Sequence, residues 1–467
     1  MKSKLPYDIT SRDSILSYSK KLEKKSLSDF FSKEKFEVKD KGSFGKLIEK
    51  LYFYYHPNSD AEADFKEAGL ELKVTPIKKL KNGTYRSKER LVLNIINYME
   101  IAKQEFYTSD FWKKNANLLL IFYLYEKEKE LFDYLIEFVD IWSFPTYDLE
   151  IIKQDYETIR QKVLQGKAEE LSEGDTFYLG ACTKGSKGGN LREQPFSKNL
   201  AKQRAYALKQ GYVNHIIATI SKEPLKYGKL IKSPNSRISI EDIVIQKFEK
   251  FYGKSVEEII KKLQLQLNVK AKNFYANLTK AILGIASDEE IEEFEKADII
   301  VKTVRLKKNA LPKEDLSFSK FDYGQLANEE WEESEILHLL EHKFFFVFFQ
   351  YKEEKLILQK VKFWNMPYQD IMEVKKVWNQ TKEVIKKGMI VASVNKDKNG
   401  KKIRHTNFPN KDFNRVAHVR PHARDAADTS PLPVQDSLTK ADEYTKHCFW
   451  LNNRYIKNNI YLNTDFS

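Results

Sequence analysis

The stretch that decides the fold reads Asp-Phe-Lys-Glu-Ala-Gly-Leu-Glu-Leu-Lys-Val-Thr-Pro, from Asp64 to Pro76. Its second half alternates between apolar and charged residues, which predicts a β-strand with one buried face. Leu70, Leu72 and Val74 are expected on that face. The Ala-Gly pair before them predicts a turn. An α/β fold with this strand in its sheet is therefore expected.

The other face of the predicted strand carries a carboxylate and an ammonium group, from Glu71 and Lys73. A hairpin at the turn would bring the carboxylate of Asp64 beside that of Glu71. Two converging carboxylates suit Mg²⁺, which leaves its other positions for water and phosphate. A neighbouring lysine can orient the attacking water or stabilise charge on phosphorus. The pattern favours phosphodiester hydrolysis, with a solvated strand face as the alternative.

A helix is predicted just upstream, with Phe44, Leu47 and Ile48 on its buried face. Glu49 lies at the edge of that face. It is a candidate as a further metal ligand or as a residue that positions one. An ordinary surface charge on the helix is the alternative.

Composition limits the class of protein. The chain has 467 residues, a net charge of +13 and 41% apolar residues, so it is long enough for two or three domains and too apolar for wholesale disorder. The charge favours a polyanionic partner, with a solubility effect as the alternative. The longest apolar runs, 118–125 and 344–349, are too short for a membrane helix. With no secretory signal expected at the N-terminus, a cytoplasmic protein is predicted.

The chain also repeats one plan twice. Residues 142–145 (Trp-Ser-Phe-Pro) and 364–367 (Trp-Asn-Met-Pro) each precede an amphipathic helix that is expected to end at Gly166 or Gly388. Two further pairs recur in the same order, namely 41–45 with 272–276 and 206–217 with 449–460. The repeat predicts two α/β domains, 1–220 and 239–467. The Lys-, Pro- and Ser-rich stretch 221–238 is the predicted linker.

These motifs resemble a known family. The chain is similar to the mismatch-repair nicking endonuclease MutH, and more so to the related GATC-cutting type II restriction endonucleases, the Sau-type enzymes. The resemblance rests on several segments in order, which are 41–49, 64–76, 79–98, 171–174 and 182–185.

The resemblance implies a mixed-sheet nuclease fold that cleaves double-stranded DNA at GATC, before the G, with Mg²⁺. It implies that Glu49, Asp64 and Glu71 are the acidic, metal-binding residues and that Lys73 is the motif lysine. A further family lysine matches Lys114, with the neighbouring Lys113 as the alternative.

The resemblance also places DNA contacts in a loop of each half. In the N-terminal half the matching residues are Thr183, Lys184 and Gly185, where the sequence departs from MutH. In the C-terminal half they are Arg420, Pro421 and His422, and Arg420-Pro421 matches MutH better. Arginine can bond guanine O6 and N7 as a fork; a phosphate contact is the alternative.

The two halves differ at the acidic positions. Glu293 and Lys302 align with Asp64 and Lys73, but the repeat has Ile300 for Glu71 and Lys280 for Glu49. We expect the C-terminal half to keep the fold, to lack metal chemistry, and to bind a second GATC site as effector or clamp. A transient homodimer on DNA remains open.

Two other functions compete with an autonomous restriction enzyme. One is a MutH-like nicking endonuclease that acts with repair partners, and the other is a DNA-binding protein without catalysis. The doubled chain argues against the first and the intact acidic set argues against the second. The sequence leaves methylation sensitivity open.

Overall fold

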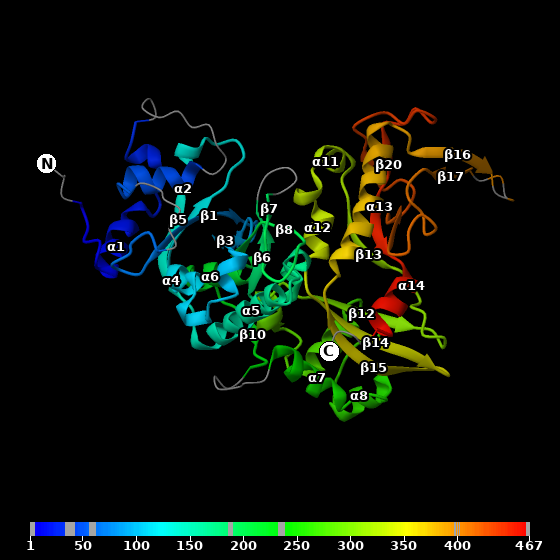
Figure 1. Cartoon of the computed structure of the whole chain (residues 1–467). Coiled ribbons are helices and arrows are strands. Elements are labelled where there is room, and N and C mark those ends of the chain that lie inside the picture. The colour runs from blue at the N-terminus through cyan, green and yellow to red at the C-terminus, as the bar shows by residue number, and fades with distance from the viewer. Residues whose placement is uncertain are drawn as a thin grey trace. The chain divides into compact units, whose positions relative to one another are not determined.

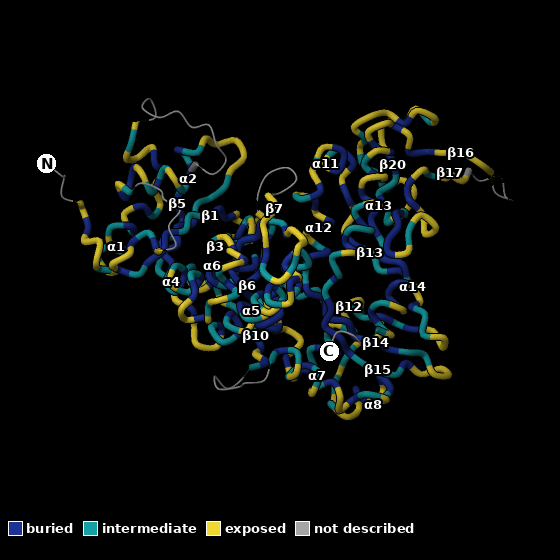
Figure 2. The backbone as a smooth tube through the Cα atoms, in the orientation of Figure 1, coloured by how far each residue is buried: buried dark blue, intermediate teal, exposed yellow. Residues whose placement is uncertain are grey.

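The computed structural model describes residues 5–32, 43–55, 62–184, 190–231, 239–396, 398, 400 and 402–463. The chain forms two compact units. The first contains Met1–Ile240 together with Asp288–Ile299, and the second contains Glu241–Ser287 with Ile300–Ser467. Figure 1 shows strands flanked by helices in both units, and Figure 2 shows buried segments inside both units. None of the described helices is long and apolar enough to cross a membrane.

The first unit is built around a mixed sheet with strand order β2-β1-β4-β5. β1 runs parallel to β4, whereas β2 and β5 run antiparallel to their neighbours. A second sheet has the order β3-β9-β6. The helices and strands of this unit are α1 (Arg12–Ser19), α2 (Ser43–Leu47), η4 (Ile48–Tyr52), β1 (Glu71–Lys79), β2 (Tyr85–Ser87), β3 (Leu91–Ile95), α3 (Tyr98–Ile101), α4 (Asp110–Asn115), β4 (Asn117–Leu124), β5 (Ile136–Ser143), α5 (Thr146–Leu164), β6 (Leu179–Thr183), β7 (Leu191–Arg192), β8 (Ala201–Lys202), β9 (Arg204–Leu208), α6 (Gln210–Ile220), β10 (Tyr227–Gly228), β11 (Glu290–Ile291) and α10 (Glu292–Lys296).

The second unit repeats this arrangement, with sheets β12-β14-β15 and β13-β21-β18. β12 runs parallel to β14, and β14 pairs antiparallel with β15 in a long hairpin that Figure 1 shows in yellow. Its helices and strands are α7 (Ile240–Glu249), α8 (Val256–Lys262), α9 (Phe274–Leu283), β12 (Ile300–Leu306), β13 (Leu316–Lys320), α11 (Tyr323–Asn328), α12 (Glu335–Leu340), β14 (Phe344–Lys352), β15 (Lys355–Trp364), α13 (Tyr368–Lys386), β16 (Val391–Lys396), β17 (Lys402–Thr406), β18 (Ala417–Pro421), β19 (Thr429–Pro431), β20 (Glu443–Thr445), β21 (His447–Leu451), α14 (Asn453–Tyr455) and η10 (Ile456–Tyr461).

The predicted strand and its buried face are confirmed. β1 begins at Glu71, and Leu70 and Leu72 lie in the core of the first unit, with Val74 packed against it. The predicted helix upstream also forms, with Phe44 and Ile48 buried. Burial of the apolar face stabilises both elements, because apolar surface removed from water contributes roughly 25 cal/mol per Å².

The two long helices, α5 and α13, begin and end as the repeat predicts. Pro145 and Pro367 precede their first turns, and Gly166 and Gly388 follow their last turns with φ of 69° and 60°. A Cβ at Gly166 would lie 2.7 Å from the carbonyl oxygen of Phe196, and one at Gly388 would lie 2.5 Å from that of Gln435. Only glycine fits either position.

The same buried pair links two helices in each unit, α5 with α6 in the first and α13 with α14 in the second. The Tyr212 hydroxyl donates to the Asp148 carboxylate at 3.0 Å in the first, and the Tyr455 hydroxyl donates to the Asp370 carboxylate at 2.8 Å in the second. These tyrosines occupy matching positions in the repeated segments 206–217 and 449–460. The fold is therefore two tandem copies of one α/β plan.

The compact units do not coincide with the predicted ranges 1–220 and 239–467. Residues Asp288–Ile299 belong to the first unit, because α10 packs against α6. Two residues of this segment also form polar contacts with buried residues of the first unit. Lys296 forms a buried ion pair with Asp148 at 2.9 Å, and the Gly211 amide donates to Asp298 at 2.9 Å. The predicted linker 221–238 also falls in the first unit, and its residues 232–238 lie outside the described part.

Candidate active site

The first strand of the first unit carries the centre of the candidate site. Glu71 begins β1 and is only 2% exposed. The Lys73 ammonium lies 2.7 Å from Glu71 Oε1 and donates to the carbonyl oxygen of Leu93 at 3.3 Å. Since residues two apart on a strand share a face, the backbone itself brings these opposite charges together.

Asp64 reaches the same place through the predicted hairpin. Phe65 and Leu70 form an isolated antiparallel bridge, closed by Gly69 with φ of 57°. The Asp64 amide then donates to Glu71 Oε2 at 3.2 Å, and the amide of Leu72 donates to Asp64 Oδ2 at 3.0 Å. The two carboxyl groups are therefore held side by side at the end of the sheet.

Of the two candidate lysines, the structure brings Lys114 to this cluster. Its ammonium lies 3.7 Å from Glu71 Oε1, with the side chain 12% exposed. Lys113 instead pairs with Asp110 at 3.9 Å, and its side chain is 58% exposed. α4 is capped by Ser109, whose hydroxyl accepts from the Trp112 amide, and this cap fixes which lysine faces the sheet.

Glu49 lies on η4, a π-helical turn, a rare geometry that often marks functional sites. Burial raises the pKa of its carboxyl group, and the negative charge of Asp64 raises it further. Burial also raises the pKa of Glu71, against the opposing effect of Lys73. Each carboxyl group is thus held where its charged form needs a cation, which is typical of metal-binding acids.

The donor set suits Mg²⁺ without forming a complete cage. Across the described ranges, no group of three or more His, Cys, Asp or Glu side chains is arranged to hold a metal ion. Mg²⁺ commonly takes one or two protein carboxylates and completes its shell with water and phosphate oxygens. The converging oxygens of Asp64 and Glu71 meet that requirement, and Glu49 is close enough to act on both electrostatically.

In the first unit the predicted DNA-contact residues end strand β6. Thr183 is its last residue, and Lys184 follows it, exposed, with its amide donating to the carbonyl oxygen of Gln203 at 2.9 Å. Gly185 lies outside the described residues.

The matching strand of the second unit, β18, carries Arg420, Pro421 and His422 at its end. The Arg420 guanidinium stacks over the Trp450 ring at 3.8 Å and lies 3.2 Å from the Asp315 carboxylate. His422 bonds the Cys448 sulfur through Nδ1 at 3.1 Å. Pro421 is exposed. A guanidinium held on an indole face is pre-organised for bidentate recognition.

Sequence reasoning did not identify Asp315 or Trp450 as partners of Arg420. Trp450 occupies the position of Ala207 in the repeat. This change from a small to a large aromatic residue was the signal in the sequence that could have pointed to Trp450. Asp315 gave none, because it precedes β13 and meets Arg420 only through the pairing of β13 and β18 with β21.

The position of Glu71 is apolar in the second unit. Ile300 begins β12 opposite Phe344, as Glu71 begins β1 opposite Leu118. Glu293, the counterpart of Asp64, accepts from the amides of Leu230 and Ile231 at 3.0 and 2.9 Å. Lys280 replaces Glu49 on α9, which packs against β12. The carboxylate pair of the first unit therefore has no counterpart at the start of β12.

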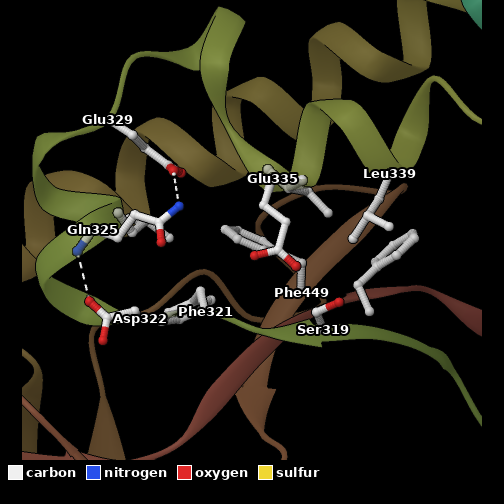
Figure 3. A pocket seen from close by; sticks show the side chains of 11 residues that line it. Ser319, Phe321, Asp322, Gln325, Glu329, Glu335, Leu339 and Phe449 are labelled. Atoms are coloured by element: carbon white, nitrogen blue, oxygen red, sulfur yellow. Dashed lines mark hydrogen bonds between the residues drawn. The ribbon is translucent and has the colours of Figure 1, made fainter. Parts of the chain in front are cut away.

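A separate small pocket in the second unit lies between β13, α11 and α12 (Figure 3). Its volume is about 20 Å³, and apolar side chains such as Phe318 and Phe449 line it. Asp322 and Glu329 at its edge are both bonded to Gln325. Its acidic residues make it unsuitable for a polyanion.

Two comparisons with known proteins agree with this architecture. The family of the DNA mismatch repair enzyme MutH matches the chain twice, over residues 53–155 and 284–386, so the chain holds two tandem MutH-like domains. The chain is also 39% identical over 455 residues to the type II restriction enzyme Sau3AI of Staphylococcus aureus, which covers 90% of this chain and 92% of that protein. The chain belongs to the family of MutH-related type II restriction endonucleases and is a site-specific endonuclease.

Proposed function

We propose that the protein cuts both strands of double-stranded DNA at GATC, before the G, in a reaction that needs Mg²⁺. The first unit cleaves, and the second binds another GATC site as an allosteric effector or clamp. The observation that carries the proposal is the contrast at one position of the repeat. Glu71 is buried beside Asp64 and Lys73, whereas its counterpart is Ile300. The recognition sequence and the cut position rest on the resemblance to Sau-type enzymes.

Asp64 and Glu71 would hold the metal ion, with Glu49 as a further ligand or positioning group. Bound Mg²⁺ supplies a water of lowered pKa and neutralises charge on the phosphate. Hydrogen bonds from the amides of Leu72 and Asp64 keep the two carboxylates in place. Lys73, 2.7 Å from Glu71, would orient the attacking water or stabilise charge on phosphorus. Lys114 would add a second positive charge.

DNA contacts would come from both units. Thr183, Lys184 and Gly185 would contact the site being cut. Arg420, with Pro421 and His422, would read the second site, and its stacking on Trp450 favours a fork to guanine.

The test is digestion, with Mg²⁺, of plasmids that carry one or two GATC sites, followed by end-mapping of the products. We expect double-strand breaks before the G, faster on the two-site plasmid, with added GATC duplex stimulating the one-site plasmid. Nicks alone would indicate a MutH-like nicking enzyme, and binding without cutting would indicate a non-catalytic protein. Equal rates without stimulation would overturn the role given to the second unit.

A further inference from the structure

The second unit has a polar cavity at the place that corresponds to the candidate active site. The cavity has a volume of about 200 Å³ and lies along β12 and β13. Among its lining residues are Lys302, Arg305, Lys313, Asp315 and Ser317. Lys302 pairs with Phe346 of β14 in the register in which Lys73 pairs with Leu120 of β4. The cavity is therefore the second unit's version of the site around the motif lysine.

Lys302 differs from Lys73 in having no counter-charge. Lys73 is bonded to Glu71, but Ile300 stands at that position in the second unit. Within the described part of the chain, Lys302 has neither an ion-pair partner nor a hydrogen-bond partner, and burial is what lowers its pKa. A half-buried ammonium without a partner is costly to the fold, and the cost is relieved when an anion enters.

The acidic residues of the cavity are already paired with cations. Glu314 lies 3.5 Å from Arg305. Asp315 pairs with Lys411 at 2.7 Å and with Arg420 at 3.2 Å, and it accepts from the Asn453 amide at 2.9 Å. They therefore do not neutralise Lys302. The cavity keeps a net positive charge, with room for more than a single water molecule.

We propose that this cavity binds one backbone phosphate of duplex DNA without a metal ion, with Lys302 as the principal contact. This proposal rests on the DNA-binding role proposed for the second unit, and it identifies the backbone phosphate as the group that this unit binds. Asp315 belongs to the cavity and also holds Arg420, so phosphate contact and base contact would share one anchor. Where the first unit meets the phosphate through carboxylates and a metal ion, the second would meet it through an ammonium group directly.

The test measures binding of a GATC duplex in EDTA, over a range of salt concentrations, by the full-length chain carrying Glu71→Ala, which does not cut. We expect Lys302→Met to weaken binding about three- to tenfold and to lower the slope of log K against log salt by about 1, as loss of one phosphate contact does. Lys302→Arg should retain binding, because it keeps the charge. Lys308→Met removes an exposed lysine just beyond β12 and should change neither quantity.

An unchanged salt slope in Lys302→Met would overturn the proposal. Thermal melting checks that the Lys302→Met variant folds. Because the substitution removes an unpaired, half-buried charge, its melting temperature should equal or exceed that of the parent chain. If inorganic phosphate raises the melting temperature of the parent chain but not of Lys302→Met, while both bind DNA alike, the cavity takes a small free anion and the DNA assignment is wrong. Plasmid cleavage by chains with Glu71 intact tests the proposed function separately, so the two failures are distinguishable.

Discussion

Two strands of this chain, β1 and β12, hold matching positions in the repeat but differ in electrostatics. Both pair in parallel with the next strand of a mixed sheet, and both carry a lysine at the third position. In β1 the first position is a buried glutamate that pairs with the lysine, and in β12 it is Ile300. The change from Glu71 to Ile300, together with Lys280 in place of Glu49, thus separates a site suited to a cation from one suited to an anion.

The largest effect is expected from Glu71→Ala. Removal of a proposed metal ligand should reduce the cleavage rate by about 10²–10³-fold or more, because charge on the reacting phosphate loses its stabilisation. DNA binding in EDTA should persist, since the lost group is negative. Glu67→Ala, an exposed carboxylate in the same hairpin, is the matched control and should cut normally. Comparable loss in both variants would place the chemistry elsewhere.

The next largest effect is on the free energy of unfolding. The aspartate of the repeated Tyr–Asp pair has a different cationic partner in each unit. Lys296, 4% exposed, lies 2.9 Å from Asp148, whereas Arg415, 76% exposed, lies 3.6 Å from Asp370. Lys296→Met should destabilise the first unit by about 3–5 kcal/mol, because it leaves a buried charge unpaired. Arg415→Met should cost under about 1 kcal/mol, since exposed pairs are screened. Chemical denaturation of both variants measures this, and equal effects would contradict the assignment.

The insertion that Lys296 belongs to could not be predicted from the sequence. Composition marked residues 221–238 as a linker, because Lys, Pro and Ser are local signals. The packing of α10 on α6 depends on contacts such as Asp148 with Lys296, which are far apart in sequence. The alternation of β1 and the turn at Gly69 are local, and they sufficed to predict that Asp64 lies beside Glu71.

For a related reason, the structure was needed to decide whether Lys113 or Lys114 lies at the candidate site. α4 has only six residues, too few for its apolar periodicity to fix its orientation. The Ser109 cap and the packing of Phe111 decide it. The parallel pairing of β1 with β4 likewise could not be predicted from the sequence, because the paired residues are more than forty positions apart in the chain.

Lys114→Ala should therefore reduce cleavage by about 10–100-fold, the usual loss for a group that supports a metal-site residue. Lys113→Ala should have no effect, because that side chain is exposed and pairs with Asp110. Single-turnover cleavage at saturating Mg²⁺ distinguishes the two. A larger loss in Lys113→Ala would show that the helix presents its other lysine to the DNA.

The smallest effect is a pH dependence that comes from the acidic cluster of the first unit. Burial raises the pKa of Glu71 and of Glu49, so the folded chain without metal binds more protons than the unfolded chain just above the ordinary carboxyl range. Stability in EDTA should therefore fall as pH rises through that window, and Glu71→Gln should lessen the fall. Mg²⁺ competes with these protons, so the Mg²⁺ concentration that gives half-maximal cleavage should rise as pH falls. The rise should be at most about tenfold per pH unit for each carboxyl group. Melting at two pH values, with Ile300→Ala as the control without a charge change, measures the first trend, and Mg²⁺ titrations of cleavage measure the second. If stability in EDTA instead rose with pH, and Glu71→Gln left that trend unchanged, the acidic cluster would be stabilised by its lysines and would need no metal ion.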